Sequence, residues 1–178
     1  MSCELLEEPV AVWGETEIAP KALRQVLGSY PTGVAVVTTR TADGRAVGLT
    51  INSFASLSLD PALVLWSLVD RSPNLVAFRE APHFAISVLG DDHQALAQRF
   101  ATGGLPDKFE GVEVREAPEG LPVIDGAVAT LVCALDRHVA AGDHLLFIGR
   151  VLRMDRREGE PLVFHRGRFA AIAAGLTP

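Results

Sequence analysis

Residues 33–51 read Gly33-Val-Ala-Val-Val-Thr-Thr-Arg40, Thr41-Ala-Asp-Gly44 and Arg45-Ala-Val-Gly-Leu-Thr-Ile51. The first segment is rich in β-branched residues, which favour strands, and the third is expected to be the return strand. The Asp-Gly pair between them is typical of a tight hairpin turn. This stretch therefore predicts an antiparallel strand pair near the start of the chain.

Further short strands are expected along the rest of the sequence. Apolar, β-branched runs bounded by turn residues predict strands at 54–59, 62–69, 83–89, 127–135, 145–154 and 162–164. Pro61 cannot donate a hydrogen bond to a ladder, so the Asp60-Pro61 pair is expected at a corner between two strands.

Three short helices are expected in addition to these strands. Pro20 predicts the start of a helix over 21–27, and Gly28 predicts its end. The apolar face of that helix would consist of Leu23, Val26 and Leu27.

A second helix is predicted at Ser72-Pro73, with Ser72 as the N-cap and Pro73 at the first helical position. Its inward-facing residues would be Leu75, Val76 and Phe78. A third helix is predicted over 93–100, capped by Asp92, and residues 101–111 are expected to form a loop.

The predicted elements indicate a mainly β fold. The strands do not alternate with long helices, and neither GxGxxG after a strand nor GxxxxGK[ST] occurs, which argues against a parallel dinucleotide-binding sheet. A closed or split antiparallel β-barrel with a few short helices fits best.

Composition limits the class of protein. The 178 residues suit one domain, and 48% hydrophobic against 21% charged residues excludes a disordered chain. We expect residues 1–17 to form a tail and residues 18–178 to form the domain. The apolar content exceeds what one small domain covers, which favours a subunit interface. A net charge of −6 argues against a nucleic-acid partner.

The cellular setting is predicted from cysteines and hydropathy. Cys3 and Cys133 provide neither a disulfide framework nor a CxxC metal site, which suits a reduced, cytoplasmic protein without a metal. No signal peptide is apparent, and no apolar run approaches the roughly 20 residues that a membrane helix needs.

Three segments carry unusual polar residues. Tyr30-Pro-Thr-Gly33 leads directly into a core strand, Thr50–Ser58 interrupts an apolar strand pair with hydroxyl and amide groups, and Gly142-Asp-His-Leu145 places a histidine at a strand end. Small polar groups beside exposed backbone N–H groups suit a phosphate or a planar polar ring. A β-bulge with local turns and a surface histidine in an ordinary hairpin are the alternative readings.

Taken together, these motifs resemble the split-barrel, FMN-binding-like flavin reductase family, the reductase components of two-component flavin-dependent monooxygenases. The resemblance runs from about Leu23 to Phe169. It is carried by residues 30–39, 48–58, 61–64, 100–101, 108–111, 142–144, 149–151, 161–164, 167 and 169.

The resemblance implies a homodimer with flavin near the subunit interface and a nicotinamide nucleotide beside His144. The residues that it assigns to cofactor binding are Thr32, Thr50, Ile51, Asn52, Ser53, Ser56, Ser58, Arg71, Ser72, Asn74, Phe100, Lys108, Phe109, His144, Phe164 and Phe169. Among these, Ser72 and Asn74 are expected near the flavin phosphate, and Lys108 and Phe109 are expected to close over the cofactor.

The implied activity is hydride transfer from NADH or NADPH to FAD or FMN, with reduced flavin passing to a partner monooxygenase. His144 is the one candidate catalytic residue, because the flavin does the chemistry and the protein supplies orientation. The alternatives are a flavin-binding module without turnover, an oxidoreductase of the same fold that holds its flavin tightly, and a small interaction domain.

Overall fold

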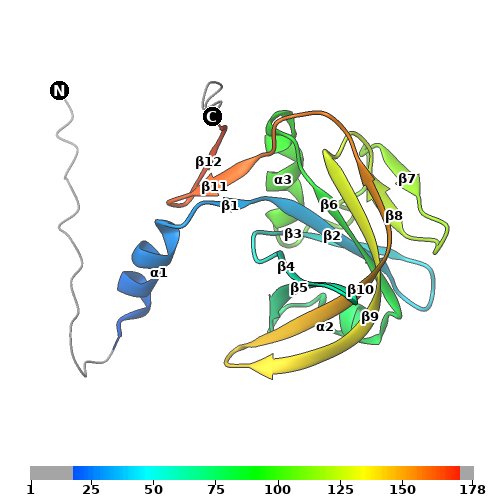
Figure 1. Cartoon of the computed structure of the whole chain (residues 1–178), viewed down its shortest axis with the longest axis horizontal. Coiled ribbons are helices and arrows are strands. Elements are labelled where there is room, and N and C mark those ends of the chain that lie inside the picture. Colours follow the sequence, from blue (N-terminus) through cyan, green and yellow to red (C-terminus); the bar gives the residue numbers. More distant parts are fainter. Residues whose placement is uncertain (1–17, 173–178) are drawn as a thin grey trace.

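A computed structural model describes residues 18–172, which fold into a curled seven-stranded antiparallel sheet with two smaller sheets and short helices around it (Figure 1). The helical elements are α1 (Pro20–Gly28), α2 (Leu75–Glu80), the 3-10 turn η1 (Asp91–His93) and α3 (Gln94–Ala101). The strands are β1 (Thr32–Gly33), β2 (Ala35–Arg40), β3 (Ala46–Ile51), β4 (Ala55–Leu59), β5 (Ala62–Val69), β6 (His83–Val88), β7 (Val114–Glu116), β8 (Pro122–Ile124), β9 (Ala129–Ala141), β10 (His144–Arg156), β11 (Val163–His165) and β12 (Arg168–Ala170).

The main sheet is a barrel that remains open along one seam. Its seven strands run in the order β3-β2-β6-β9-β10-β5-β4, and every neighbouring pair is antiparallel. The two edge strands, β3 and β4, are joined by residues 52–54 alone, which span roughly 10 Å at most. This short connection brings the two edges of the sheet near each other. Because β3 and β4 are not hydrogen-bonded to each other, the barrel is not closed. The predicted mainly β, split-barrel architecture is confirmed.

Aromatic rings fill the centre of this sheet. Trp66 on β5 and Phe147 on β10 stack with ring centroids 4.4 Å apart and planes 10° apart. Phe78 from α2 meets Trp66 edge-on at 5.0 Å, and Phe84 from β6 does so at 5.8 Å. All four side chains are buried, so α2 is held to the sheet by its phenylalanine.

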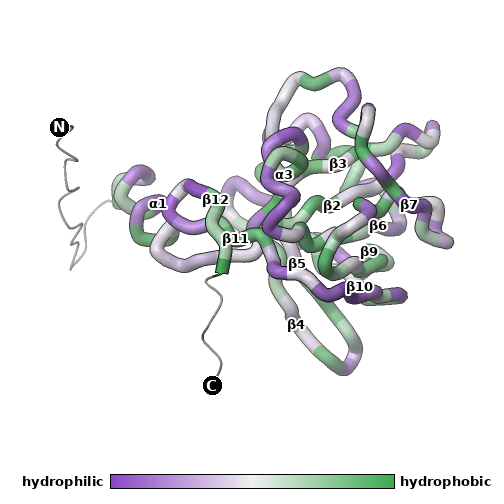
Figure 2. The backbone as a smooth tube through the Cα atoms, turned by 90° about the horizontal axis from the view of Figure 1, so that it is seen from above, coloured by the Kyte–Doolittle hydropathy of each residue, from purple (hydrophilic) through white to green (hydrophobic). Residues whose placement is uncertain are grey.

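A smaller core lies between the barrel and α3. Phe100, Ala97 and Leu89 are completely buried there, and the second, three-stranded sheet β1-β11-β12 packs against it through Phe164 and Phe169. Figure 2 shows this sheet and α1 on one side of the molecule, apart from the main sheet.

The predicted first helix is confirmed, but its apolar face is uncovered. Leu23, Val26 and Leu27 are 44%, 55% and 62% exposed, and α1 buries none of its residues in the described chain. Gly28 is the last helical residue rather than the residue after the end, and Ser29 is the C-cap.

The other two helices begin later than the sequence predicts. Pro73 and Asn74 form a turn, closed by the N–H of Leu75 to the Ser72 carbonyl, and α2 starts at Leu75; the Ser72 hydroxyl accepts the N–H of Asn74 within that turn. Val76 was expected to face inward but is 53% exposed. Asp92 lies inside η1 and caps nothing.

Most of the predicted strands occur where they are expected, but several differ from the prediction in length. Asp60-Pro61 forms the expected corner, and its peptide bond is cis. The predicted strands 127–135 and 145–154 are parts of a longer ribbon, β9–β10, which continues past the barrel to a turn at Gly142. The short strands β7, β8 and β12 were not predicted, because each has only three residues and no alternating pattern.

The predicted tail 1–17, including Cys3, lies outside the described residues. Within residues 18–172 no helix is long and apolar enough to cross a bilayer.

Candidate functional site

Two cavities lie one after the other along β3. The first, here called the histidine pocket, has a volume of about 210 Å³ and is bounded by residues 49–53, residues 67–69 and His144. The second, here called the lysine pocket, has a volume of about 300 Å³ and is bounded by residues 45–48, Asn74 and residues 105–109. The lining of the lysine pocket ends at Gly48 and that of the histidine pocket begins at Leu49, so the two pockets are neighbours along β3, and together they are here called the groove.

The wall of the histidine pocket is built where β3 ends at the open seam. The Ser53 hydroxyl accepts a hydrogen bond from the N–H of Ser67 at 3.1 Å and lies 3.2 Å from the Ser67 carbonyl. Thr50 donates its hydroxyl proton to the carbonyl of Ala97 at 2.6 Å. These two side chains therefore fix the wall, whereas Asn52 is exposed and keeps its amide available to a ligand.

His144 enters the same pocket from the start of β10. Its Nδ1 lies 2.7 Å from a carboxylate oxygen of Asp143. This hydrogen bond and the charge of His144 lower the pKa of Asp143 below its ordinary value, and Arg71 lowers it further. The Asp143 carbonyl accepts the N–H of Asp70, which ties the turn to the end of β5. The contact orients the imidazole so that Nε2 is left for a ligand.

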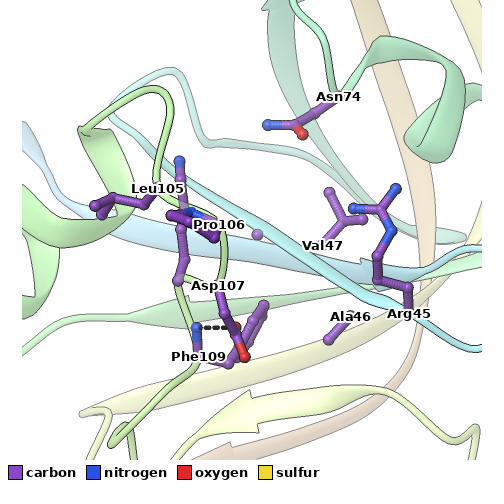
Figure 3. Close-up of a pocket in the computed structure, with 10 residues that line it drawn as sticks. Arg45, Ala46, Val47, Asn74, Leu105, Pro106, Asp107 and Phe109 are labelled. Atoms are coloured by element: carbon purple, nitrogen blue, oxygen red, sulfur yellow. Dashed lines mark hydrogen bonds between the residues drawn. The ribbon is translucent and has the colours of Figure 1, made fainter.

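The lysine pocket has the loop after α3 as its outer wall (Figure 3). Lys108 donates from Nζ to the carbonyl of Phe100 at 2.7 Å, and burial lowers the pKa of its ammonium. Arg99 on α3 donates to the carbonyls of Lys108 at 2.7 Å and Asp107 at 3.2 Å. The N–H of Phe109 donates to the Asp107 carboxylate at 2.8 Å. These four bonds fasten the loop where it borders the cavity.

Phe100 does not face the groove, although the sequence assigned it to cofactor contact. Its side chain is completely buried and meets Phe109 edge-on, with centroids 5.0 Å apart. A Cβ at Gly48 would lie 2.7 Å from the Phe100 ring and 3.1 Å from that of Phe109. Glycine at 48 thus allows the ring to pack against β3, so Phe100 supports the floor of the lysine pocket.

A third group of expected residues lies on the small sheet. Thr32 on β1 pairs with Phe164 on β11, and Phe169 on β12 contacts Phe164 edge-on at 5.6 Å. The Thr32 hydroxyl is buried without a hydrogen-bond partner among residues 18–172. Leaving such a group unpaired costs about 1–3 kcal/mol, which is a reason to expect a ligand or partner there.

The remaining expected residues lie around these three groups. Ser56 and Ser58 are on β4, the strand on the other side of the open seam. Ser72 uses its hydroxyl within the turn before α2. Arg71, expected at a phosphate, instead lies close enough to Asp143 to influence its pKa. Ile51 borders the histidine pocket, but its side chain belongs to the core.

The structure adds residues that the sequence did not suggest. Arg45, Leu105 and Pro106 border the lysine pocket, and Arg99 fastens its loop. These positions come together only when the hairpin of β2 and β3 packs beside the loop after α3, and no local motif marks that contact. Among residues 18–172, no three His, Cys, Asp or Glu side chains are grouped to hold a metal ion.

Comparisons with known proteins identify the family of the chain. Residues 27–173 match the family described as the flavin reductase like domain. The FMN reductase (NADH) SmoA of Agrobacterium fabrum is 45% identical over 153 residues, covering 86% of each chain. The reductase subunit HsaB of a flavin-dependent monooxygenase from Rhodococcus jostii is 38% identical, covering 90% of this chain and 82% of HsaB.

Solved structures give the same result. The NADH:FAD oxidoreductase SgcE6 of Streptomyces globisporus, in complex with NAD and FAD fragments, superposes with a TM-score of 0.85 at 37% identity, covering 91% of this chain and 99% of SgcE6. Component B of nitrilotriacetate monooxygenase from Mycobacterium thermoresistibile gives 0.84 at 34% identity, covering 89% of each chain. With this fold, these relatives and a groove of polar backbone and hydroxyl groups along an open barrel seam, the chain belongs to the flavin reductase family.

Proposed function

We propose that this chain transfers hydride from NADH or NADPH to FMN or FAD and supplies reduced flavin to a partner monooxygenase. The observation that carries the proposal is the groove along β3, in which His144 lines the same pocket as the polar segment 50–53. The relatives named FMN reductase (NADH) and reductase subunit of a flavin-dependent monooxygenase have the same activity class.

The groove has the donors and acceptors that a flavin needs. We infer that the ring binds at the seam, against residues 50–53, which line the histidine pocket, and the exposed amide of Asn52, with Ser56 and Ser58 on the strand across the seam. The flavin phosphate then lies in the lysine pocket, near Asn74 and the ammonium of Lys108. Lys108 has three donors and spends one on the Phe100 carbonyl, so two remain for a phosphate.

The chain's own residues contribute position rather than covalent chemistry. A bound flavin supplies the hydride acceptor, and reacting atoms must be held about 3–3.5 Å apart for efficient transfer. His144, oriented by Asp143, binds the nicotinamide nucleotide in this proposal. The bonds of Ser53 to Ser67 and of Thr50 to Ala97 keep the pocket wall rigid, which avoids an ordering cost on binding.

The proposal includes a homodimer. The uncovered apolar face of α1 needs a partner, and Leu59 and Met154 are 95% and 83% exposed in the single chain. Strand β1, which contains Thr32 and its unpaired hydroxyl, belongs to the small sheet that lies with α1 on one side of the molecule (Figures 1 and 2). We further propose residues 18–178 as the domain, residues 1–17 as a tail and the cytoplasm as the location.

The decisive experiment is oxidation of NADH and NADPH by the purified protein, followed at 340 nm with FAD, FMN or no added flavin. The proposal expects oxidation that depends on flavin and on His144. A protein that binds flavin but never oxidises either nucleotide would be a flavin-binding module instead. A protein that is purified with stoichiometric flavin bound, and that oxidises the nucleotide without added flavin, would hold the flavin as a prosthetic group.

A further inference from the structure

The lysine pocket contains a second cation that the proposed mononucleotide contacts do not use. Arg45 borders the cavity from the β3 side, whereas Lys108 borders it from the loop after α3, and Figure 3 shows the two walls facing each other. The Arg45 guanidinium makes no hydrogen bond or ion pair with any side chain in the part of the chain that the structure describes. It is therefore available to an anionic ligand.

The backbone of Arg45 is fixed by hydrogen bonds within the turn between β2 and β3. Its carbonyl accepts the N–H of Thr41 at 3.0 Å, and its own N–H donates to the Thr41 hydroxyl at 3.1 Å. The turn is closed by the N–H of Gly44 to the Thr41 carbonyl at 2.8 Å, and Arg40 donates to the Gly44 carbonyl at 2.9 Å. A well-fixed backbone reduces the entropy lost when the guanidinium engages a ligand.

Two carboxylates near the cavity are occupied by their own surroundings. Asp107 accepts the N–H of Phe109, which Figure 3 shows as a dashed line. Asp43 accepts the hydroxyl of Thr41, and this bond is the largest cause of its lowered pKa; the charge of Arg45 lowers that pKa as well, without a hydrogen bond or ion pair between the two side chains. The two cations thus remain as the groups that face an anion, and Leu105, which is 40% exposed beside Pro106, adds apolar surface at the mouth.

We propose that Arg45 contacts the second phosphate of a flavin dinucleotide, so that this chain binds FAD more tightly than FMN. Lys108 and Arg45 on opposite walls match a diphosphate, since a guanidinium pairs well with phosphate oxygens. Leu105 and Pro106 provide a flat apolar surface for the adenine ring. This inference rests on the proposed function and specifies its substrate.

The test is the Kd of FAD and of FMN, measured by titration calorimetry for the unmodified protein, Arg45→Gln and Arg156→Gln. Arg156→Gln is the control, because it removes the same charge from an exposed position at the far end of β10. We expect FAD to bind the unmodified protein more tightly than FMN. Arg45→Gln should raise the Kd of FAD about tenfold, as expected for the loss of a charge-assisted hydrogen bond, and should change the Kd of FMN by less than about twofold.

Leu105→Ala is a second, independent variant, and it should raise the Kd of FAD without changing the Kd of FMN. The inference is overturned if Arg45→Gln weakens both flavins equally, if it weakens neither, or if it raises the KM of NADH while both flavins bind as before. In each of those cases the unmodified protein still reduces flavin, so the proposed function stands. If the unmodified protein binds neither flavin, the proposed function itself fails.

Discussion

Asp143 and His144 are adjacent in sequence and hydrogen-bonded through their side chains, with 2.7 Å between a carboxylate oxygen and Nδ1. They occupy the tip of the β9–β10 ribbon, which extends beyond the barrel and returns at Gly142. The ribbon carries the histidine to the end of β5, where His144 pairs with Val69. A residue on a hairpin tip thereby becomes a wall of the pocket at the barrel seam.

The first prediction concerns His144. His144→Ala should raise the KM of NADH more than it weakens flavin binding, because the proposed imidazole contact is with the nicotinamide nucleotide. Asp143→Asn should have a smaller effect in the same direction, since it removes the charge of the orienting carboxylate and leaves an amide oxygen that still accepts a hydrogen bond. Steady-state kinetics at saturating flavin measure the first quantity, and flavin titration measures the second. His138→Ala, an exposed histidine on the same ribbon, is the control.

Much of the barrel could be predicted because its signals are local. The hairpin of β2 and β3 follows from β-branched residues and Asp-Gly, and Pro61 marks the corner between β4 and β5. The length of the β9–β10 ribbon could not be predicted, since residues 136–141 are exposed and lack a buried face. Cross-strand pairing alone extends those strands.

Part of the candidate site could also be predicted from local motifs, and part could not. The segment 50–53 and the Gly-Asp-His turn are local motifs, and the structure brings them into one pocket. No local sequence motif marks Arg45 or Arg99 as site residues, because their importance depends on a contact between the hairpin and the loop after α3. Phe100 was assigned to the cofactor by motif, whereas burial beneath Gly48 gives it a supporting position.

The second prediction concerns Thr32, whose buried hydroxyl has no partner in the described chain. Thr32→Val keeps the shape and removes the hydroxyl, so the unliganded protein should unfold at an unchanged or higher temperature. If flavin or the second subunit satisfies the hydroxyl, the same variant should weaken flavin binding or dimerisation by about 1 kcal/mol. Thermal unfolding, flavin titration and sedimentation separate these effects. Lower stability with unchanged binding would show that the hydroxyl serves the fold alone.

The third prediction concerns Arg99, which donates to two carbonyls of the loop that borders the lysine pocket. Arg99→Met should release residues 107–109 and weaken flavin binding severalfold, while Arg99→Lys should recover part of the affinity. Hydrogen exchange should increase at the N–H of Phe109 in the methionine variant. An unaltered exchange rate together with unaltered affinity would contradict this role.

The fourth prediction concerns Gly149 on β10. A Cβ at this position would lie 2.3 Å from the ring of Phe84 and 3.0 Å from Cβ of Cys133, both of which are buried. Gly149→Ala should therefore lower the free energy of unfolding by about 1–3 kcal/mol, as overpacking does. Gly103→Ala is the matched control, because nothing lies within 4 Å of its added methyl group. Equal stability of the two variants in denaturant titrations would refute the close packing described for Phe84.

The last prediction concerns Cys133, a completely buried thiol on β9. Burial raises its pKa from an ordinary value of 9.0 to about 12, because the thiolate loses its hydration. Above pH 9 the unfolded chain releases this proton and the folded chain retains it, so the unfolded state is favoured. The free energy of unfolding should therefore fall with rising pH by up to about 1.4 kcal/mol per pH unit from this group, until the folded thiol also ionises.

Other groups titrate in the same range, so the comparison must isolate Cys133. In a Cys3→Ser background, unfolding is measured between pH 8 and 11 with and without Cys133→Ala. The alanine variant is expected to be less stable at pH 8, because a buried side chain is shortened, and to lose stability less steeply as the pH rises. The slope, rather than the stability at any one pH, carries the test, since a cavity lowers stability equally at every pH. Parallel slopes would mean that the thiol ionises as readily in the folded chain as in the unfolded one.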